Sequence, residues 1–517
     1  MPTQLIALLV LAFPWLNPVA SGPSPAVVPW LVSTASICLV CLFVSIHQVD
    51  VVAMSARAWL VAASASGVIA LLQYFGASAS FSPWINGTAL GEAFANLRQR
   101  NQFATLTNIG LAACLWWITR CKESLPAREI SPLFPMAWSL AAAALMAAGN
   151  AASSSRTGLL ELVLVAGMLL WWGRLNEPEV RRVLLAAGMA YCVAVFALPR
   201  LAGLEPSTSG LLARLHDGDP VCASRLTLWN NVLHLIAQKP WLGWGWGELD
   251  YAHFVTLYPG TRFCDILDNA HNLPLHLAVE LGLPLALLVC GWGTWLVWRL
   301  RPWREADPAR QLAWAVLALI MLHSMLEYPL WYGPFQIATG LCIWILWATR
   351  QKKHARLDAM GCQQESARSA RQFKLARSIA GCASVLLLAG VAYAAWDYHR
   401  ISQIYLPPSM RSPAYRENTA QKITGSWLFR NQVRFAELTM TAVTANTAAH
   451  VNELAHELLH FSPEARVVEK LIESAVMLRR DDEAIFYLAR YRVAFPTEHA
   501  QWAKTRAPTL QAPPSAD

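Results

Sequence analysis

The sequence predicts an all-α, polytopic membrane protein with about eleven spans, a large outward loop and a carboxy-terminal helical domain. Three observations predict this class. The 517 residues are 55% hydrophobic and only 14% charged, whereas soluble domains carry about 25% charged residues. Long apolar runs fill most of the chain, and a charged segment without any such run follows them.

The apolar runs follow one another from the amino terminus, and several reach the roughly 17–25 residues that cross a bilayer. No basic residues precede the first run, which favours an uncleaved span over a signal peptide. The predicted spans are 5–20, 27–46, 52–75, 103–119, 133–149, 158–172, 183–198, 273–297, 312–326, 335–348 and 379–395.

Lysine and arginine gather in alternate loops, and such loops are expected on the cytoplasmic side. This charge pattern places the amino terminus inside and the polar loop at about 200–271 outside. An odd number of spans then puts the carboxy-terminal segment outside as well. The basic loops hold Arg120, Lys122 and Arg128, then Arg174, Arg181 and Arg182, then Arg299, Arg301, Arg304 and Arg310, and finally the stretch 350–377.

Residues 1–395 form the predicted membrane unit, and residues 396–506 form a predicted outward-facing α-helical domain. Apolar residues recur there at three- and four-residue spacing in 431–444, 451–459, 465–478 and 482–495. Paired helices of this length resemble tetratricopeptide hairpins, and a small helical bundle fits the pattern equally well. The Pro/Ala-rich end, 507–517, is predicted to be a disordered tail.

Charge and cysteine usage exclude several function classes. The net charge of +8 comes mostly from the predicted cytoplasmic loops, and no basic stripe with interleaved aromatics indicates a nucleic-acid partner. No Cys or His cluster has zinc spacing, so neither a metal nor a cofactor is expected. Cys222 and Cys264 both lie in the outward loop, where an oxidising compartment favours a disulfide between them.

Two arginines follow serines at the predicted starts of helices. Ser153-Ser-Ser-Arg156 opens the sixth span from its outer side, and Ser224-Arg225 begins a helix in the outward loop, downstream of Arg214. A guanidinium donates two parallel, charge-assisted hydrogen bonds to a phosphate, and a helix amino terminus adds backbone donors. Interfacial or solvated charges are the alternative interpretation of each arginine.

His271 lies in Asp268-Asn-Ala-His271-Asn272, directly before an apolar run. A neutral imidazole there can accept a proton from an attacking hydroxyl near neutral pH, and Asp268 or Asn272 could orient it. A histidine that simply rests at the interface is the alternative. The same region also offers His216, His234, His253 and His276.

Two further outward segments carry polar groups beside spans. Glu327, near the end of an apolar run, is costly unless it is paired or faces a polar cavity, so we expect it in the wall of the site, paired with an arginine. Gln99 and Asn101 lie in an amide- and guanidinium-rich segment before a span, where they suit either a glycan or phosphate contact or interfacial capping. The Trp241–Gly247 run suits stacking on sugars as well as a membrane interface.

These motifs resemble a known family. Arg225…Trp229, the 240–247 segment and His271-Asn272 together resemble the O-antigen ligase/polymerase superfamily of bacterial inner-membrane glycosyltransferases. Asn96-Leu-Arg-Gln-Arg-Asn-Gln-Phe-Ala resembles the Gly-Asn-Leu-Gly-Gln-Pro-Asn element of PglL-type protein O-oligosaccharyltransferases (pilin glycosylases), and 323–332 resembles their Glu-Tyr-Pro-Leu-Trp-Tyr element. Arg98 and Arg100 replace the expected Gly and Pro.

The resemblance implies transfer of a preassembled oligosaccharide en bloc from undecaprenyl diphosphate to a Ser or Thr of a periplasmic protein such as a pilin. It implies an acceptor-side role for His271, diphosphate contacts for Arg156 and Arg225, and looser roles for Gln99 and Tyr332. The three principal residues are expected to converge on one cavity at the periplasmic face of the inner membrane.

Two alternatives differ in acceptor or class. The same chemistry could serve lipid A core or a growing glycan. A lipid-linked sugar transporter is less favoured, because transporters place polar residues near the middle of their spans, whereas the polar clusters here gather at the outer ends.

Overall fold

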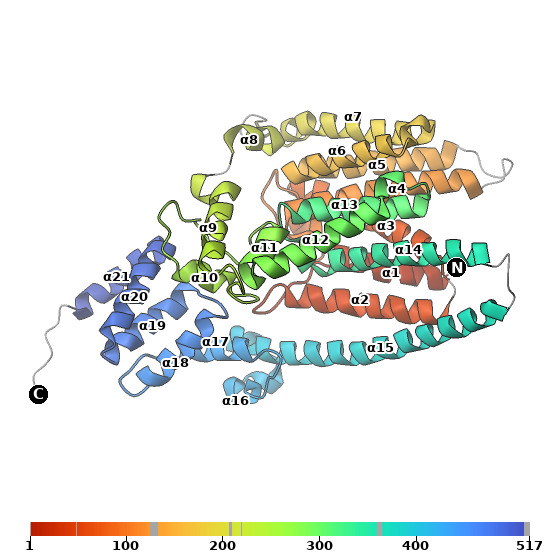
Figure 1. Ribbon diagram of the computed structural model, residues 1–517. Coiled ribbons are helices and arrows are strands. Elements are labelled where there is room, and N and C mark those ends of the chain that lie inside the picture. The colour runs from red at the N-terminus through yellow and green to blue at the C-terminus, as the bar shows by residue number, and fades with distance from the viewer. Residues whose placement is uncertain are drawn as a thin grey trace, which may run out of the picture. The chain divides into compact units, whose positions relative to one another are not determined.

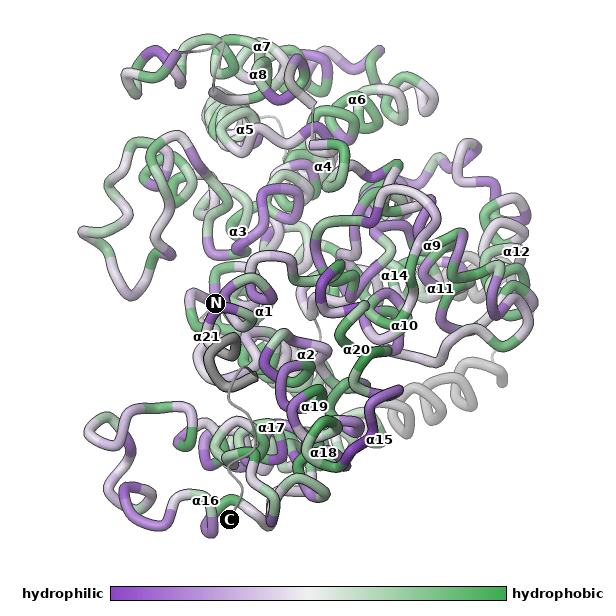
Figure 2. Tube along the Cα trace, turned by 90° about the vertical axis from the view of Figure 1, so that its left-hand side faces the viewer, coloured by the Kyte–Doolittle hydropathy of each residue, from purple (hydrophilic) through white to green (hydrophobic). Residues whose placement is uncertain are grey.

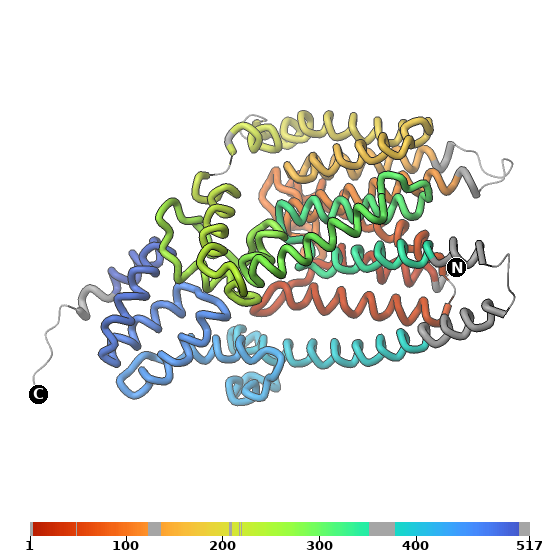
Figure 3. Tube along the Cα trace, in the orientation of Figure 1, coloured from red at the N-terminus to blue at the C-terminus, as the bar shows by residue number. Residues whose placement is uncertain are grey.

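The computed structural model describes residues 2–47, 49–124, 133–205, 209–218, 220–358 and 364–510, whose regular structure consists of helices without β-strands. The chain divides into two compact units. Unit 1 comprises Met1–Gly218 and Trp295–Tyr393, and unit 2 comprises Asp219–Thr294 and Ala394–Asp517. Each unit therefore joins two segments that are distant in the sequence, as the chain colours of Figure 3 show.

Unit 1 is a bundle of long helices that lie side by side (Figure 1). The division between the units falls within two further helices, α12 (Leu283–Leu300) and α15 (Gln364–Ser402). The helices of unit 1 are α1 (Pro2–Leu16), α2 (Val27–Ile46), α3 (Val51–Tyr74), α4 (Arg100–Ser124), α5 (Leu133–Ala152), α6 (Arg156–Trp171), α7 (Pro178–Leu201), α8 (Gly210–Asp217), α13 (Pro308–Ser324) and α14 (Gly333–Asp358).

Small residues let these helices approach closely, as is usual between membrane helices. On α4, a Cβ added to Gly110 would lie 2.3 Å from the Ala63 Cβ of α3 and 2.6 Å from the Met146 sulfur of α5. The large side chains of Trp59 and Phe103 are fully buried in the same core. Close contact between α3, α4 and α5 fixes the start of α4, where several candidate site residues lie.

Five helices among the described residues are long and apolar enough to cross a membrane, which indicates a multi-pass membrane protein. They are Val27–Ile46, Val51–Tyr74, Pro178–Leu201, Leu283–Arg304 and Ser378–Tyr405. Helices cover most of every predicted span, but the full number of crossings stays a prediction.

The predicted span 273–297 is wrong as a single helix. α11 (Leu273–Leu281) ends after nine residues, and α12 begins at Leu283. Gly282 separates them with a φ of +83°, a conformation that ends a helix and that glycine adopts without steric cost. The apolar run hid this break because hydropathy does not register backbone conformation.

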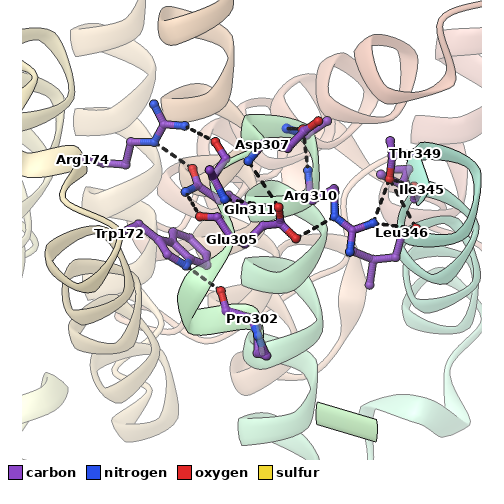
Figure 4. Close-up of polar contacts among 12 residues, drawn as sticks. Trp172, Arg174, Pro302, Glu305, Asp307, Arg310, Gln311, Ile345, Leu346 and Thr349 are labelled. Carbon is purple, nitrogen blue, oxygen red and sulfur yellow. Dashed lines mark hydrogen bonds and ion pairs between the residues drawn. The ribbon is translucent and has the colours of Figure 1, made fainter. Parts of the chain in front are cut away.

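Basic residues of the loops predicted to be cytoplasmic bind neighbouring helices (Figure 4). Arg174, between α6 and α7, donates from Nε to Gln311 Oε1 of α13 at 2.8 Å. Arg310 forms a 2.6 Å ion pair with Glu305 and donates to the Leu346 carbonyl of α14 at 2.7 Å. These arginines therefore hold α6, α13 and α14 together at one end of unit 1.

Unit 2 combines the loop at about 200–271 that is predicted to face outward, still called the outward loop, with the carboxy-terminal helices. The helices of unit 2 are α9 (Arg225–Gln238), α10 (Leu249–Val255), α11, α16 (Thr419–Ile423), α17 (Arg430–Met440), α18 (Ala448–Leu459), α19 (Ala465–Met477), α20 (Asp481–Ala494) and α21 (Pro496–Leu510). The predicted amphipathic segments coincide with α17–α20, except that α17 ends at Met440, before the predicted 444. Hydrophilic and hydrophobic residues alternate along α18 and α19 (Figure 2). α21 continues to Leu510, past the predicted start of the tail at 507, while 511–517 lie outside the described residues.

The loop and the carboxy-terminal helices share one hydrophobic core. Phe254 of α10 is fully buried and stacks parallel to Tyr487 of α20, with ring centroids 6.5 Å apart. Arg490 of α20 donates to the Val255 carbonyl at 2.6 Å, and His460 lies 2.7 Å from a Glu248 carboxylate oxygen. The carboxy-terminal domain thus supports the loop that contains His271.

Candidate active site

The start of α6 places Arg156 at the end of a buried serine turn. Ser155 caps the helix, because its hydroxyl oxygen accepts a hydrogen bond from the Gly158 N–H at 2.9 Å. Ser153, Ser154 and Ser155 are all buried, whereas Arg156 is partly exposed. The predicted helix start is therefore present, with Arg156 as the first residue of α6.

A cluster of amides and a carboxylate lies beside this turn; we call Gln99, Asn101, Ser155 and Glu327 the amide cluster. Glu327 accepts from the amide nitrogens of Gln99 at 3.1 Å and Asn101 at 3.0 Å. Asn101 in turn accepts from the Ser155 hydroxyl at 2.6 Å. Three motifs that are far apart in the sequence thus meet next to Arg156. The predicted contact of Glu327 with an arginine stays a prediction.

A second polar group continues from this cluster into the helix bundle. The Thr105 hydroxyl lies 2.7 Å from a Glu161 carboxylate oxygen and 2.8 Å from His323 Nδ1. Asn108 donates to the other Glu161 oxygen at 3.0 Å, and Glu161 is fully buried. This group was not among the predicted site residues, although an acidic residue inside an apolar run is the signal that indicates one.

Arg214 on α8 also reaches the start of α6. Its guanidinium donates to the Ser154 carbonyl at 3.2 Å, two residues before Arg156. The sequence placed Arg214 only upstream of Arg225 in the outward loop. The structure instead brings it to the serine turn, where it adds a second guanidinium at the start of α6.

Arg98 and Arg100, which replace the expected Gly and Pro of the PglL-type element, lie at positions where the backbone conformation favours those two residues. Arg98 has a φ of +60°, the left-handed region in which glycine is unstrained. Arg100 is the first residue of α4, the helix position that proline favours. The expected Gly and Pro therefore suit the backbone geometry, and this chain makes the same turn with two arginines.

In unit 2, Arg225 begins α9 in the same manner as Arg156 begins α6. The Ser224 hydroxyl oxygen accepts from the Thr227 N–H at 3.2 Å and caps the helix. A disulfide joins Cys222 to Cys264 just before this cap. The bond ties the start of α9 to the segment that leads to His271.

His271 occupies a strained turn at the start of α11. Its φ is +49°, which is uncommon for a residue other than glycine and is typical of functional positions. Its N–H donates to the Asn269 side-chain oxygen at 2.9 Å. Asn272 caps α11 by accepting from the Leu275 N–H at 3.1 Å. Asn272 therefore orients the helix start, and a direct role in orienting the imidazole stays a prediction.

The Trp241–Gly247 segment, here called the tryptophan loop, caps the other end of α11. The N–H groups of Trp244 and Gly245 donate to the carbonyls of Val279 and Glu280 at 2.9 and 3.0 Å. The last carbonyls of a helix have no hydrogen-bond donor within the helix, so the N–H groups of the tryptophan loop serve as their donors. Trp241 and Trp246 remain 75% and 62% exposed and can still contact sugar or lipid.

His276 and Glu280 form a buried pair beneath the tryptophan loop. His276 Nε2 and Glu280 Oε2 are 3.4 Å apart, and each side chain is 2% exposed. Burial raises the pKa of Glu280 to about 7. Burial, helped by the charge of His271, lowers the pKa of His276 to about 4. His276 is therefore a neutral imidazole that supports the helix behind His271, a role that its position alone did not indicate.

Asp250 is a further acidic group that was not among the predicted site residues. Burial raises its pKa to about 7, and the carboxylates of Glu248 and Asp268 add to the shift. Asp268 is exposed, and its predicted role in orienting His271 stays a prediction. Tyr332, in unit 1, stacks against Tyr328 with ring centroids 5.9 Å apart.

The predicted site residues thus fall into two groups. Gln99, Asn101, Glu327, Tyr332 and Arg156 belong to unit 1, where the amide cluster lies next to Arg156. The other group belongs to unit 2 and consists of Arg225, Asp268, His271, Asn272 and the disulfide. Convergence of the two arginines with His271 stays a prediction.

Three family models match parts of the chain. An O-Antigen ligase model matches residues 141–290, a range that contains Arg156, Arg225 and His271. A protein glycosylation ligase model matches residues 93–118, which include Gln99 and Asn101. A model for the carboxy-terminal part of a virulence factor membrane-bound polymerase matches residues 311–509.

Two relatives from Acinetobacter baylyi (strain ATCC 33305 / BD413 / ADP1) are similar to this chain. A general O-oligosaccharyltransferase is 24% identical over 306 residues, 56% of this chain and 50% of the relative. A ComP-specific O-oligosaccharyltransferase is 27% identical over 260 residues, 49% of this chain and 44% of the relative. The matched region thus spans about half the length of each relative. These matches bear out the resemblance of the chain to PglL-type protein O-oligosaccharyltransferases of the O-antigen ligase superfamily.

Proposed function

We propose that this protein is a glycosyltransferase that moves a preassembled oligosaccharide en bloc from undecaprenyl diphosphate to a Ser or Thr hydroxyl of a periplasmic protein such as a pilin. The reaction takes place at the periplasmic face of the bacterial inner membrane. The amide cluster carries this proposal. It joins the motif of the protein glycosylation ligases to Glu327 and to the serine turn before Arg156.

The reaction requires the protein first to stabilise the departing diphosphate and second to take the proton from the acceptor hydroxyl. The bond between the anomeric carbon and the diphosphate oxygen breaks, and its electron pair stays on the diphosphate. A new bond forms between that carbon and the acceptor oxygen, whose proton passes to an imidazole nitrogen of His271. Single displacement inverts the anomeric centre.

Arg156 and Arg225 suit the first task because each stands at a serine-capped helix start, where backbone N–H groups reinforce the guanidinium. Fixed positive charge at the leaving group stabilises the transition state without requiring a metal. Arg214, at the serine turn, is a third donor for the same anion.

The acceptor is proposed to be a protein rather than lipid A core or a growing glycan. Both relatives named above are O-oligosaccharyltransferases, and the protein glycosylation ligase match covers the Gln99 segment. Because O-antigen ligase and polymerase models also match the chain, the experiment below includes lipid A core and a growing glycan as possible acceptors.

Proteoliposomes that contain only this protein, a lipid diphosphate-linked oligosaccharide and a pilin test the proposal. We expect glycosylated pilin, detected by mass spectrometry. Movement of the donor across the bilayer without a product would indicate a transporter, and product only on added lipid A core would indicate a ligase.

Variants in the same assay test the residue roles. His271→Ala should reduce transfer by about a hundredfold or more, the usual contribution of an acid–base group. His216→Ala, at an exposed position of α8, serves as the control. Near-normal transfer by His271→Ala would refute its role as base. Arg225→Ala should weaken donor binding, and an unchanged donor affinity would remove this residue from the diphosphate site.

A further inference from the structure

A cavity of about 1000 Å³ lies in unit 1 between α1, α3, α4 and α5. Its volume is at the upper end of the range for small-molecule sites. Apolar side chains form most of its wall, including Met54, Leu60, Trp117 and Leu145. Val61 and Trp138, which also line it, are 41% and 64% exposed, so the cavity opens sideways onto the surface that faces lipid.

The charged residues of the cavity wall are Asp50, Arg57 and Arg120. Asp50 and Arg120 are 3.7 Å apart, and the Arg57 guanidinium lies over the Trp117 ring at 4.7 Å from its centroid. Within the described part of the chain, no carboxylate forms an ion pair with Arg57. The cavity therefore carries one more positive than negative charge.

Arg57 lies seven residues after Asp50, inside the candidate membrane helix Val51–Tyr74. An arginine inside a span is costly unless it faces a polar group or an anion. Arg57 lies beside the Trp117 ring and lines the cavity. A phosphate at the mouth would satisfy both Arg57 and Arg120 by charge-assisted hydrogen bonds.

The cavity lies at the opposite end of unit 1 from the amide cluster. Gln99 directly precedes α4, and Arg120 lies 21 residues further along, near the other end of this helix. The separation is about 32 Å along a helix, about the thickness of the hydrocarbon core. The charge rule assigns the Arg120 end to the cytoplasmic leaflet. The donor diphosphate, in the proposed function, binds at the other end.

The dimensions suit a lipid tail. Cavity-lining residues on α3 extend from Asp50 to Ser64, a length of about 21 Å at the rise of an α-helix, and one leaflet of the hydrocarbon core is about 15 Å deep. Basic pockets between membrane helices on the cytoplasmic side bind anionic lipid headgroups.

We propose that this cavity binds an anionic phospholipid of the cytoplasmic leaflet. Its phosphate lies between Arg57 and Arg120, and one acyl chain lies along α3, α4 and α5. The site is separate from the transfer site, and the lipid is a structural partner of unit 1.

Native mass spectrometry of the detergent-solubilised full chain tests this proposal, with phosphatidylglycerol and phosphatidylcholine as competing probes. Wild type should retain phosphatidylglycerol about tenfold more strongly than phosphatidylcholine. Arg57→Gln with Arg120→Gln should abolish this preference. Arg181→Gln with Arg182→Gln is the matched control, because it removes two exposed charges outside the cavity and should keep the preference.

A measurement on the unaltered protein guards against misfolded variants. Cys121 lines the cavity, and Cys290 on α12 does not. Phosphatidylglycerol, but not phosphatidylcholine, should slow maleimide labelling of Cys121 several-fold relative to Cys290, as read by peptide mapping. Equal retention of both lipids, or unchanged Cys121 labelling, would overturn the proposal. Displacement of the bound lipid by undecaprenyl phosphate would assign the cavity to the carrier lipid instead. Glycerol phosphate, which has the phosphate but no acyl chain, should not displace the lipid.

Discussion

At the scale of single residues, the amide cluster depends on the ability of Glu327 to accept two hydrogen bonds. One carboxylate oxygen accepts from Gln99 and the other from Asn101. A glutamine at this position has only one acceptor oxygen, so its NH₂ group would face a donor amide. An unsatisfied buried donor costs about 1–3 kcal/mol, and the disturbance reaches Arg156 through Asn101 and Ser155.

We therefore expect Glu327→Gln to fold and to reduce oligosaccharide transfer about tenfold or more. The comparison variant is Glu92→Gln, which removes a carboxylate that is 46% exposed and 3.5 Å from Arg100. Equal transfer rates for these two variants would show that the amide cluster does not position the site.

Asp250 gives a second residue-scale expectation, concerning pH. Burial raises its pKa from an ordinary 3.8 to about 7, so the folded protein binds the proton more tightly than the unfolded chain. Stability from the neutral carboxyl is present at low pH and is lost as the pH rises towards about 7. Asp250→Asn should therefore lose less thermal stability than wild type between pH 5 and pH 8.

Thermal unfolding at several pH values measures this difference. Asp265→Asn, which changes an exposed carboxyl of the same loop, should follow the wild-type pH profile. Parallel profiles for wild type and Asp250→Asn would contradict the assignment.

At the scale of elements, glycines let α11 and the tryptophan loop approach within backbone contact. A Cβ on Gly282 would lie 2.2 Å from the Trp241 carbonyl oxygen, and one on Gly243 would lie 2.3 Å from the Glu280 carbonyl oxygen. Both glycines have positive φ values. Packing against α11 thus explains Gly243 of the Gly-Trp-Gly-Trp-Gly motif, whereas Gly245 and Gly247 have positive φ values of +119° and +78° and a Cβ added to either would meet no atom of α11.

Gly282→Ala should destabilise unit 2 by about 2–4 kcal/mol, because the new methyl group meets backbone and the φ is unfavourable for alanine. Gly291→Ala on α12 is the matched control: a Cβ there meets no atom within 4 Å, and alanine favours the helix by about 1 kcal/mol. Chemical unfolding followed by tryptophan fluorescence compares them. Similar midpoints for the two variants would refute the packing argument.

At the scale of the whole molecule, the carboxy-terminal helices and the outward loop unfold together if their shared core is the source of their stability. Phe254→Ala should cost about 3–5 kcal/mol, the usual range for a buried phenylalanine. The loss should appear as faster hydrogen exchange in α18–α20 as well as in α10. Trp427→Ala, at a position 78% exposed, should leave both regions protected. Faster exchange confined to α10 would show that the two parts are stable separately.

The sequence predicted helices well, because hydropathy and three- to four-residue spacing depend on neighbouring residues alone. The helix starts at Arg156 and Arg225 were predicted correctly for the same reason, and the structure adds that Ser155 and Ser224 cap them. The break at Gly282 was missed because an apolar run continues through it. Cys222 and Cys264 were paired from their shared position in the outward loop, and the structure joins them.

Local sequence thus determined the helical class, the polar ends of the helices, and the residue types available for phosphate and proton chemistry. Tertiary structure decided which of these residues are neighbours. Gln99 meets Glu327 across 228 residues, Arg214 reaches the serine turn of α6, and α10 packs on α20. Such contacts arise from the packing of buried faces between distant segments, and no local pattern of hydropathy records which faces will meet.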